Sequence, residues 1–355
     1  MEYLRLCVGI DVAQKELVCC YGALDTSLVQ HVLARRSFEN SLKGFEALFH
    51  WVEKAKPGKT APIYVMEATG VYHQNLAHWL HSNHSSVVVV LPNKVSNFMR
   101  TMNLKTITDA SSADAICQFG LEKQLQLWTP PNAVYVQLQQ LTRERDQLIN
   151  ERTIISNQLH ALESGAFVHQ PTLHRLNERK VLLDVQEAAI KAEIHQLIGS
   201  DSKLQTQVAL ITSIPGIAET TAAVILGETN GFELIRNKRQ LSSYAGLDVA
   251  VKESGTSVKT KSRLSKKGNT RLRKAMHMPA LSAIRHCQVY NRVFNRLQSR
   301  SGVKMKAVVA VQRKLLELTY IIHKTQKPFD PGYETRKEQS TRVVAPSESG
   351  LCRFL

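Results

Sequence analysis

Residues 6–12 read LCVGIDV, an apolar run that carries a single acid, Asp11, near its end. Such a run is typical of a buried β-strand. Two more strand-like runs follow it, LVCCY at 17–21 and HVLARRSF at 31–38. Short turns separate the three runs, so we expect them to begin one sheet.

The next hundred residues alternate between helical and strand-like patterns. We expect a helix from Asn40 or Ser41 to about Lys54, a strand at 62–66, a helix near 71–82 and a strand at 86–91 that Pro92 stops. Strands followed by crossover helices predict a mixed α/β sheet with both faces covered. Pro130 and Pro131 mark the expected end of this domain, which we place at 1–131.

The chain has 355 residues, of which 43% are hydrophobic, so it can bury more than one core. Its formal net charge of +16 and its pI of about 9.6 favour a polyanionic partner, either nucleic acid or an anionic membrane. We find no signal peptide and no apolar run of membrane length, which leaves a membrane role with little support. Six scattered cysteines suggest free thiols in a reducing cytosol.

The pattern changes at about residue 132. Apolar residues recur at alternating three- and four-residue steps from Val134 to Leu162 and again from Leu173 to Leu197. Gly165 and Pro171 interrupt them. We expect an antiparallel helical hairpin over 132–200, either a coiled coil used for oligomerisation or an ordinary helical connector packed on its own domain.

A third region is expected at 201–327, followed by a flexible tail at 328–355. Residues 207–230 (QVALITSIPGIAETTAAVILGETN) predict a helix-hairpin-helix-like unit, whose turn amides could hold a phosphate, or else a plain helical turn. Residues 231–274 are loop-rich and basic, and 275–324 are mostly helical. The predicted fold class is therefore α/β followed by all-α.

Acids stand where strands are expected to end. Asp11 closes the first strand and Glu67 follows the fourth, while Asp109 and Asp114 lie on TDASSADAICQFG at 108–120. Clustered carboxylates are the ligands that Mg²⁺ or Mn²⁺ prefers, and such ions support phosphodiester chemistry. The plainer interpretation is a set of solvated carboxylates, with Asp109 capping a helix.

The most basic segment, at 252–274, reads KESGTSVKTKSRLSKKGNTRLRK. This density of cations predicts contacts with phosphate backbones. Its nine cations, our candidate nucleic-acid-binding residues, are Lys252, Lys259, Lys261, Arg263, Lys266, Lys267, Arg271, Arg273 and Lys274. Ser254, beside Gly255, could serve as a nucleophile that the cations activate, with Ser257, Ser262 and Ser265 as alternatives. On residues alone, a serine here is more simply a phosphate hydrogen-bond donor.

Eight short motifs occur in one order along the chain. They are GIDVAQKE at 9–16, MEATGVYH at 66–73, DAICQFG at 114–120, LWTPP at 127–131, IPGIAETTAAVILGE at 214–228, SYAGLDV at 243–249, ESG at 253–255 and LSKKGNTRLRK at 264–274. With them the chain resembles, from residue 5 to about 325, the DEDD-type transposases of the insertion-sequence-110 group, whose relatives include the Piv-type DNA invertases.

This resemblance implies a RuvC-like (ribonuclease-H-like) N-terminal domain, a coiled-coil connector and a C-terminal transposase domain with an essential serine. Asp11, Glu67 and Asp114 match three of the four metal-binding acids, and Ser254 matches the serine that forms a transient phosphoserine link to DNA. The family's last two acids stand three apart, as D-x-x-D-A. Counting back from Asp114 reaches Ser111, so Asp109 is our candidate for the third acid.

The implied partners are donor and target DNA, a guide noncoding RNA and further copies of the chain, as a dimer or a tetramer. The implied location is the bacterial cytoplasm, at the nucleoid. Two other functions remain open on the sequence. One is a RuvC-like metal-dependent nuclease that needs no serine, such as a junction resolvase. The other is a nucleic-acid-binding protein without catalysis.

Overall fold

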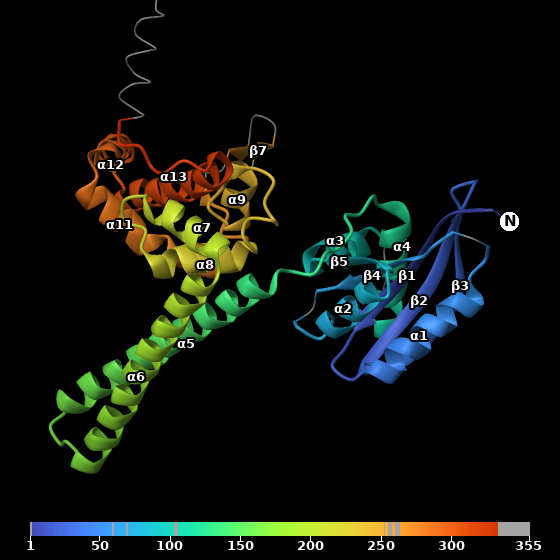
Figure 1. Cartoon of the computed structure of the whole chain (residues 1–355), viewed down its shortest axis with the longest axis horizontal. Helices are drawn as coiled ribbons and strands as arrows, with labels where there is room; N and C mark the ends of the chain where they lie inside the picture. The colour runs from blue at the N-terminus through green and yellow to red at the C-terminus, as the bar shows by residue number, and fades with distance from the viewer. Residues whose placement is uncertain are drawn as a thin grey trace, which may run out of the picture. The chain divides into compact units, whose positions relative to one another are not determined.

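The computed structural model describes residues 2–58, 60–68, 70–102, 106–251, 253–254, 258–259 and 263–332, with the backbone alone at 253–254 and 258–259. The chain divides into two compact units, Met1–Pro130 and Pro131–Leu355 (Figure 1). No helix in the described residues is long and apolar enough to span a membrane.

The N-terminal unit is built on a five-stranded sheet with the order β3-β2-β1-β4-β5. Its strands are β1 (Tyr3–Val12), β2 (Glu16–Asp25), β3 (Gln30–Glu39), β4 (Ile63–Glu67) and β5 (Ser86–Val90). The first three strands pair antiparallel, while β4 and β5 run parallel to β1. Parallel strands end at the same edge of a sheet, so the ends of β1, β4 and β5 share one edge.

Four helices cover the two faces of this sheet: α1 (Leu42–Ala55), α2 (Gln74–Ser82), α3 (Pro92–Thr101) and α4 (Asp109–Glu122). Leu6, Val8 and Ile10 of β1 belong to the core under α1 and α2, while Cys7 belongs to the core under α4. Side chains alternate along a strand, so the odd-numbered residues of β1 face α4.

Two starting points of helices bear on the sequence predictions. Ser41 caps α1, since its hydroxyl accepts a hydrogen bond from the Gly44 amide at 3.3 Å. Pro92 does stop β5, but it also occupies the first turn of α3, a helix that the sequence analysis did not predict. Proline tolerates this place because the first helical amide has no intrahelical partner.

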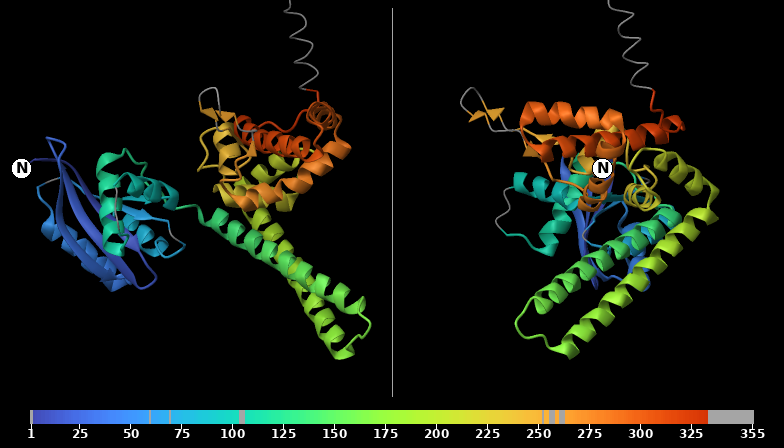
Figure 2. Two further views of the ribbon diagram at one scale, coloured as in Figure 1. Left: turned by 180° about the vertical axis from the view of Figure 1, so that it is seen from behind. Right: turned by 90° about the vertical axis from the view of Figure 1, so that its left-hand side faces the viewer.

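The second unit begins with two 31-residue helices, α5 (Ala133–Glu163) and α6 (Gln170–Ser200), which form an antiparallel hairpin (Figure 2). At its far end, Ile155 and Leu159 pack against Leu176 and Leu183. Its other end belongs to the core of the unit, as the buried Leu138 and Ile194 show. The hairpin is therefore continuous with its own domain, and its expected use in oligomerisation stays a prediction.

The described part of this unit holds seven more helices: α7 (Ser202–Thr212), α8 (Glu219–Thr229), α9 (Lys238–Tyr244), α10 (Thr270–Ala275), α11 (His277–His286), α12 (Gln288–Ser301) and α13 (Lys304–Thr325). Two pairs of two-residue strands accompany them, β6 (Val249–Ala250) with β9 (Arg263–Leu264) and β7 (Glu253–Ser254) with β8 (Val258–Lys259). The short helix α9 lies in the region expected to be loop-rich.

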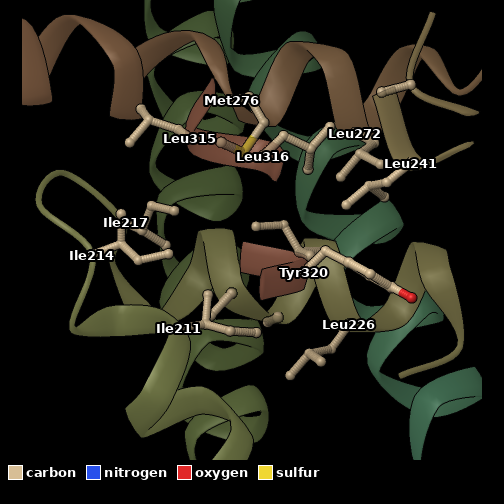
Figure 3. Close-up of a cluster of buried hydrophobic side chains, with 14 of the residues drawn as sticks. Ile211, Ile214, Ile217, Leu226, Leu241, Leu272, Met276, Leu315, Leu316 and Tyr320 are labelled. Carbon is tan, nitrogen blue, oxygen red and sulfur yellow. The ribbon is translucent and has the colours of Figure 1, made fainter. Parts of the chain in front are cut away.

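One apolar core holds these helices together (Figure 3). Ile211 of α7 and Leu226 of α8 belong to the same core as Leu272 of α10 and Leu315 of α13, and all four residues are buried. The basic segment ends in α10, so its last residues are anchored in this core. The predicted fold class, α/β followed by all-α, is confirmed.

Candidate acidic site and nucleic-acid interface

Asp11 and Glu67 lie at the same edge of the sheet. The last registered pair between β1 and β4 is Ile10 with Met66, so the next step along both strands brings Asp11 beside Glu67. Side chains two residues apart on a strand point to the same face of the sheet. Asp11 lies an even number of residues from Cys7 on β1, and Glu67 lies two residues from Val65 on β4; Cys7 and Val65 both face α4. The two carboxylates therefore point to the same side of the sheet.

The pKa of Asp11 is affected by the nearby carboxylates. Its carboxyl group is half-buried, and its pKa is raised to about 6 by burial first, then by the charges of Asp109 and Glu67. Each neighbouring carboxylate disfavours a second negative charge. Asp11, Glu67 and Asp109 thus form one electrostatic cluster, which we call the acidic site.

Helix α4 brings Asp109 to the acidic site. Thr108 caps this helix and accepts from the Ser111 amide at 3.2 Å, so Asp109 is free of the capping role considered from the sequence. Ser112 stands three residues after Asp109, on the same helix face. Its hydroxyl donates a hydrogen bond to the Asp11 carboxylate.

Glycines let α4 lie directly on the sheet. A Cβ on Gly9 would stand 2.2 Å from the Cys117 nitrogen and 2.5 Å from the Ala113 oxygen. A Cβ on Gly120, one turn further along α4, would stand 2.4 Å from the Cys7 sulfur. Backbone contact at this distance fixes the height of α4 above β1, and with it the positions of Asp109 and Ser112.

Asp114 does not join the acidic site. It lies five residues after Asp109, about 140° further round the helix, and its carboxylate pairs with Arg35 of β3. Arg35 Nε and Nη2 donate to the two oxygens at 2.8 and 3.0 Å. Partial burial acts to raise the pKa of Asp114, but hydrogen bonds from Arg35 and Cys20 outweigh it and leave the pKa below its ordinary value.

The family's spacing can also be placed on the chain in a second way. In D-x-x-D-A, Asp109 and Ala113 match the first and last letters, and Ser112 takes the place of the second acid. The side chains that face Asp11 from α4 are those of Asp109 and Ser112. Asp114, the expected fourth acid, faces β3 instead because a five-residue step turns it away from β1.

Three carboxylates and a hydroxyl are the donor set that Mg²⁺ or Mn²⁺ prefers, so the acidic site fits such an ion chemically. Among the residues that the structure describes, no three Asp, Glu, His or Cys side chains stand close enough to chelate one ion. The pKa of Asp11 is raised chiefly by burial, with smaller contributions from the charges of Asp109 and Glu67.

Sequence reasoning missed Gly9 and Ser112 of this site, and also Arg35, the partner of Asp114. Ser112 could have been found from its i, i+3 spacing to Asp109, which is the spacing of the motif itself. Gly9 is the first letter of GIDVAQKE, and a glycine inside a strand signals a close backbone approach. Arg35 carried no signal, since its partner lies 79 residues away.

The basic segment is described only in part. Lys252 and Lys261 lie outside the described residues, and Ser254 and Lys259 are seen as backbone, in the antiparallel pair β7 and β8. The other predicted cations, Arg263, Lys266, Lys267, Arg271, Arg273 and Lys274, lie on β9, on the following loop and on α10. Ser254 and its alternative Ser265 therefore stay predictions as nucleophiles, and Ser257 and Ser262 lie outside the described residues.

A groove of about 840 Å³ opens beside α10. Four cations line it: Arg145 of α5, and Arg271, Arg273 and Lys274 of α10. Thr220 and Thr221, from the first turn of α8, also line it, as does Asp146, which pairs with Lys274. The groove therefore combines cations with threonine hydroxyls, groups that contact phosphates.

Helices α7 and α8 and the turn between them occupy the region where a helix-hairpin-helix-like unit, or a plain helical turn, was expected. Gly216 has a φ of +88°, and a Cβ there would stand 2.5 Å from the Pro279 oxygen. The turn thus packs closely on α11. Phosphate binding by this turn stays a prediction.

Comparisons with known proteins identify the family of this chain. A family model for transposases of the DEDD, IS110 type matches residues 8–168, and one for the transposase IS116/IS110/IS902 family matches residues 208–295. The chain is thus a transposase, an enzyme class that cuts and rejoins DNA. It belongs to the IS110 family.

Curated relatives align over most of their length. The pilin gene-inverting proteins of Moraxella lacunata and Moraxella bovis are each 27% identical over 91% of this chain and 97% of their own. An uncharacterised insertion element IS110 protein of Streptomyces coelicolor is 26% identical over 38% of this chain and 32% of its own. Among solved structures, T. thermophilus RuvC in complex with a Holliday junction substrate matches with a TM-score of 0.27 and 9% identity, over 35% of this chain and 99% of RuvC.

Proposed function

We propose that this chain is the recombinase of an insertion sequence, which cuts and rejoins DNA with the acidic site and Ser254. The observation that carries the proposal is the register of β1 and β4, which places Asp11 beside Glu67 at one edge of the sheet. The charge of Asp109 acts on the same Asp11 carboxylate. Two relatives that align over nearly the whole chain are named for inverting a gene, which requires cutting and rejoining DNA.

Asp11, Glu67 and Asp109 would hold Mg²⁺ or Mn²⁺, with the Ser112 hydroxyl in the fourth position. A divalent cation bound there supplies charge that activates a nucleophile and stabilises the leaving oxygen. The hydrogen bond from Ser112 to Asp11 favours the ionised carboxylate and so prepares the site for a cation. Asp114 as a fourth ligand stays a prediction, and its pairing with Arg35 weighs against it.

Ser254 would be the nucleophile of strand exchange. Its hydroxyl gives up a proton, a bond forms between Oγ and the phosphorus, and the bond from phosphorus to the leaving sugar oxygen breaks as that oxygen takes a proton. A sugar hydroxyl from the second site then attacks the phosphoserine and releases the serine. The cations of the segment support this role, because they stabilise the charge that builds on the phosphate.

Two further parts of the proposal concern partners. A guide noncoding RNA would pair with donor and target DNA, so the protein itself needs no code for reading bases. The net charge of +16 supports binding to more than one nucleic acid. The acids and the serine would come from different copies of the chain in a dimer or a tetramer.

A covalent adduct distinguishes the proposal from a plain metal-dependent nuclease. Wild-type protein incubated with donor and target DNA and the guide RNA should yield a protein–DNA adduct on a denaturing gel. Ser254→Ala should abolish the adduct and the exchange while DNA binding survives. Normal exchange by Ser254→Ala would rule out the serine role.

Two matched variants complete the test. Asp11→Asn should abolish both adduct and cleavage, whereas Ser265→Ala should leave both within about threefold of wild type. Cleavage without any adduct would favour the nuclease. Because Ser112 stands where the family has an acid, a non-catalytic binding protein is a second candidate. Binding of DNA by the wild type without any cleavage would support it.

A further inference from the structure

Glu228, near the end of α8, is a deeply buried carboxylate at which three parts of the second unit meet. Its side chain is 1% exposed. Arg143 of α5 donates to it from Nε at 2.7 Å and from Nη2 at 2.9 Å, and Asn269 donates from Nδ2 at 2.7 Å. Burial acts to raise the pKa of Glu228, but Arg143 and Asn269 outweigh burial and lower it, so the group is ionised at neutral pH.

Asn269 connects Glu228 to the basic segment. While its amide nitrogen donates to Glu228, its side-chain oxygen accepts from the Leu272 amide at 2.9 Å and caps α10. Its backbone amide donates to the Tyr244 carbonyl at 2.7 Å, and the Tyr244 hydroxyl donates to the Glu228 carbonyl at 2.9 Å. The start of α10 is therefore tied to α8 by the residue that caps it.

Gly268 brings the chain into this position. Its φ is +148°, and a Cβ there would stand 2.4 Å from the Tyr244 carbonyl oxygen. Only glycine permits such an approach without a shift of the backbone. The loop that precedes α10 therefore has one placement against α9 and α8.

Arg143 connects the same carboxylate to the hairpin. Helices α5 and α8 touch closely, since a Cβ on Gly227 would stand 2.9 Å from the Gln139 nitrogen. Glu228 thus joins the root of the hairpin, α8 and the start of α10. We call Glu228, Arg143, Asn269 and Tyr244 the Glu228 node.

A buried ion pair is seldom needed for stability alone, because apolar residues of similar volume often serve as well. Glu187 of α6 provides the comparison within this chain. It is 5% exposed and pairs with Arg145, Arg152 and Lys191, all on the hairpin itself. The Glu228 node differs because one of its members belongs to the basic segment.

We propose that Glu228 is a positioning residue for the DNA chemistry of this domain. It fixes the position of Asn269 relative to the root of the hairpin, and Asn269 in turn fixes the start of α10 and the cations on that helix. The proposal rests on the proposed function only in naming DNA as the substrate. Arg271, Arg273 and Lys274 follow Asn269 within five residues, so a loss of its position moves all three cations.

Paired substitutions separate positioning from stability. Arg143→Leu with Glu228→Leu removes the charges and leaves Asn269 without an acceptor, whereas Arg143→Gln with Glu228→Gln removes the same charges and keeps an acceptor at 228. Full-length proteins would be compared for their Tm and for binding to a DNA duplex at several salt concentrations. The slope of log K against log salt concentration should fall in the leucine pair by an amount that corresponds to the loss of one to two phosphate contacts. In the glutamine pair this slope should stay near that of the wild type.

Asn269→Ser provides the test should the leucine pair fail to fold. Serine can still cap α10 but is too short to reach Glu228. We expect a small change in Tm with the same flattening of the salt dependence, and at least a tenfold lower kcat for strand exchange at saturating DNA. Asp184→Asn, a control within the hairpin that loses a contact with Arg152, should leave both the salt dependence and kcat within twofold.

Equal salt dependence and kcat in wild type and Asn269→Ser would overturn the proposal, as would parallel losses in Asp184→Asn. The binding measurement involves no strand exchange. A wild type that binds DNA but forms no adduct would therefore count against the proposed chemistry and leave the test of Glu228 intact.

Discussion

The guanidinium of Arg35 donates a hydrogen bond to each oxygen of the Asp114 carboxylate, at 2.8 and 3.0 Å, and Asp114 points towards β3 and away from Asp11. This acid, which the family's motif suggests as a metal ligand, therefore connects α4 to β3 through an ion pair. The acidic site is left with Asp11, Glu67 and Asp109.

Asp114→Asn should therefore spare metal binding. We expect Mg²⁺ or Mn²⁺ affinity within about threefold of wild type, measured by calorimetry, with a stability loss of roughly 1 kcal/mol or less because the Arg35 side chain is half-exposed. Asp109→Asn is the matched variant on the same helix and should lose most of the metal affinity. Equal losses in the two variants would restore Asp114 to the metal site.

Ser112→Asp should strengthen metal binding. The new carboxylate would face Asp11 from the position where the hydroxyl now donates, and would give the site a fourth acid. Without metal, the added repulsion should lower Tm, and Mg²⁺ should raise Tm by more than it does in wild type. Ser111→Asp places the same charge beside Thr108 and should show no such gain, so equal behaviour of the two variants would contradict this geometry.

The raised pKa of Asp11 predicts a pH dependence. The folded state binds the Asp11 proton up to about pH 6, while the unfolded state releases it near 3.8, so this group adds stability as pH falls from 6 towards 4. Asp11→Asn should therefore be more stable than wild type at pH 7.5 without metal, with a gain that shrinks over this range. Metal binding by wild type should weaken below pH 6, because the proton and the cation compete. Thermal unfolding across pH, with and without Mg²⁺, tests both statements.

Gly9→Ala should damage the acidic site without touching an acid. The added Cβ must push α4 away from β1, since the atoms it meets are backbone. We expect a loss of roughly 1–3 kcal/mol in the free energy of unfolding, together with a loss of metal affinity. Gly199→Ala, where nothing lies within 4 Å, should be neutral or slightly stabilising. An unchanged metal affinity in Gly9→Ala would show that the height of α4 is not needed.

The exposed cations before α10 should contribute to DNA binding through phosphate contacts. Replacing Arg263 and Lys267 by alanine should lower the slope of log K against log salt concentration by up to about 1.8 for a duplex. Lys43 and Lys54 of α1, on the opposite face of the sheet from α4, form the control pair. An equal fall of the slope in both pairs would show that the basic segment contributes to DNA binding no more than other surface cations do.

Much of the N-terminal unit could be predicted from local signals. The strands around Asp11 and Glu67 are short apolar runs, and the cap at Ser41 precedes an amphipathic stretch. Helix α3 was missed because Pro92 was interpreted only as the end of a strand, while the same residue is favourable in the first turn of a helix.

The acidic site was only partly predictable, since sequence spacing does not give the direction of a side chain. Asp109 and Asp114 are both acids in one helix, but the turn of 100° per residue sends them to different strands. The Glu228 node could not be predicted at all. Arg143, Glu228 and Asn269 are separated by 85 and 41 residues, and the packing of α5 and of the start of α10 on α8 brings them together.

The hairpin also has a mechanical consequence. Each of its helices has 31 residues and rises about 46 Å. The Arg143 side chain lies about 30 Å from the far turn, so a tilt of 5° at the root carries that turn about 3 Å. A movement of the far end of the hairpin would therefore act on the Glu228 node, and through Asn269 on the start of α10.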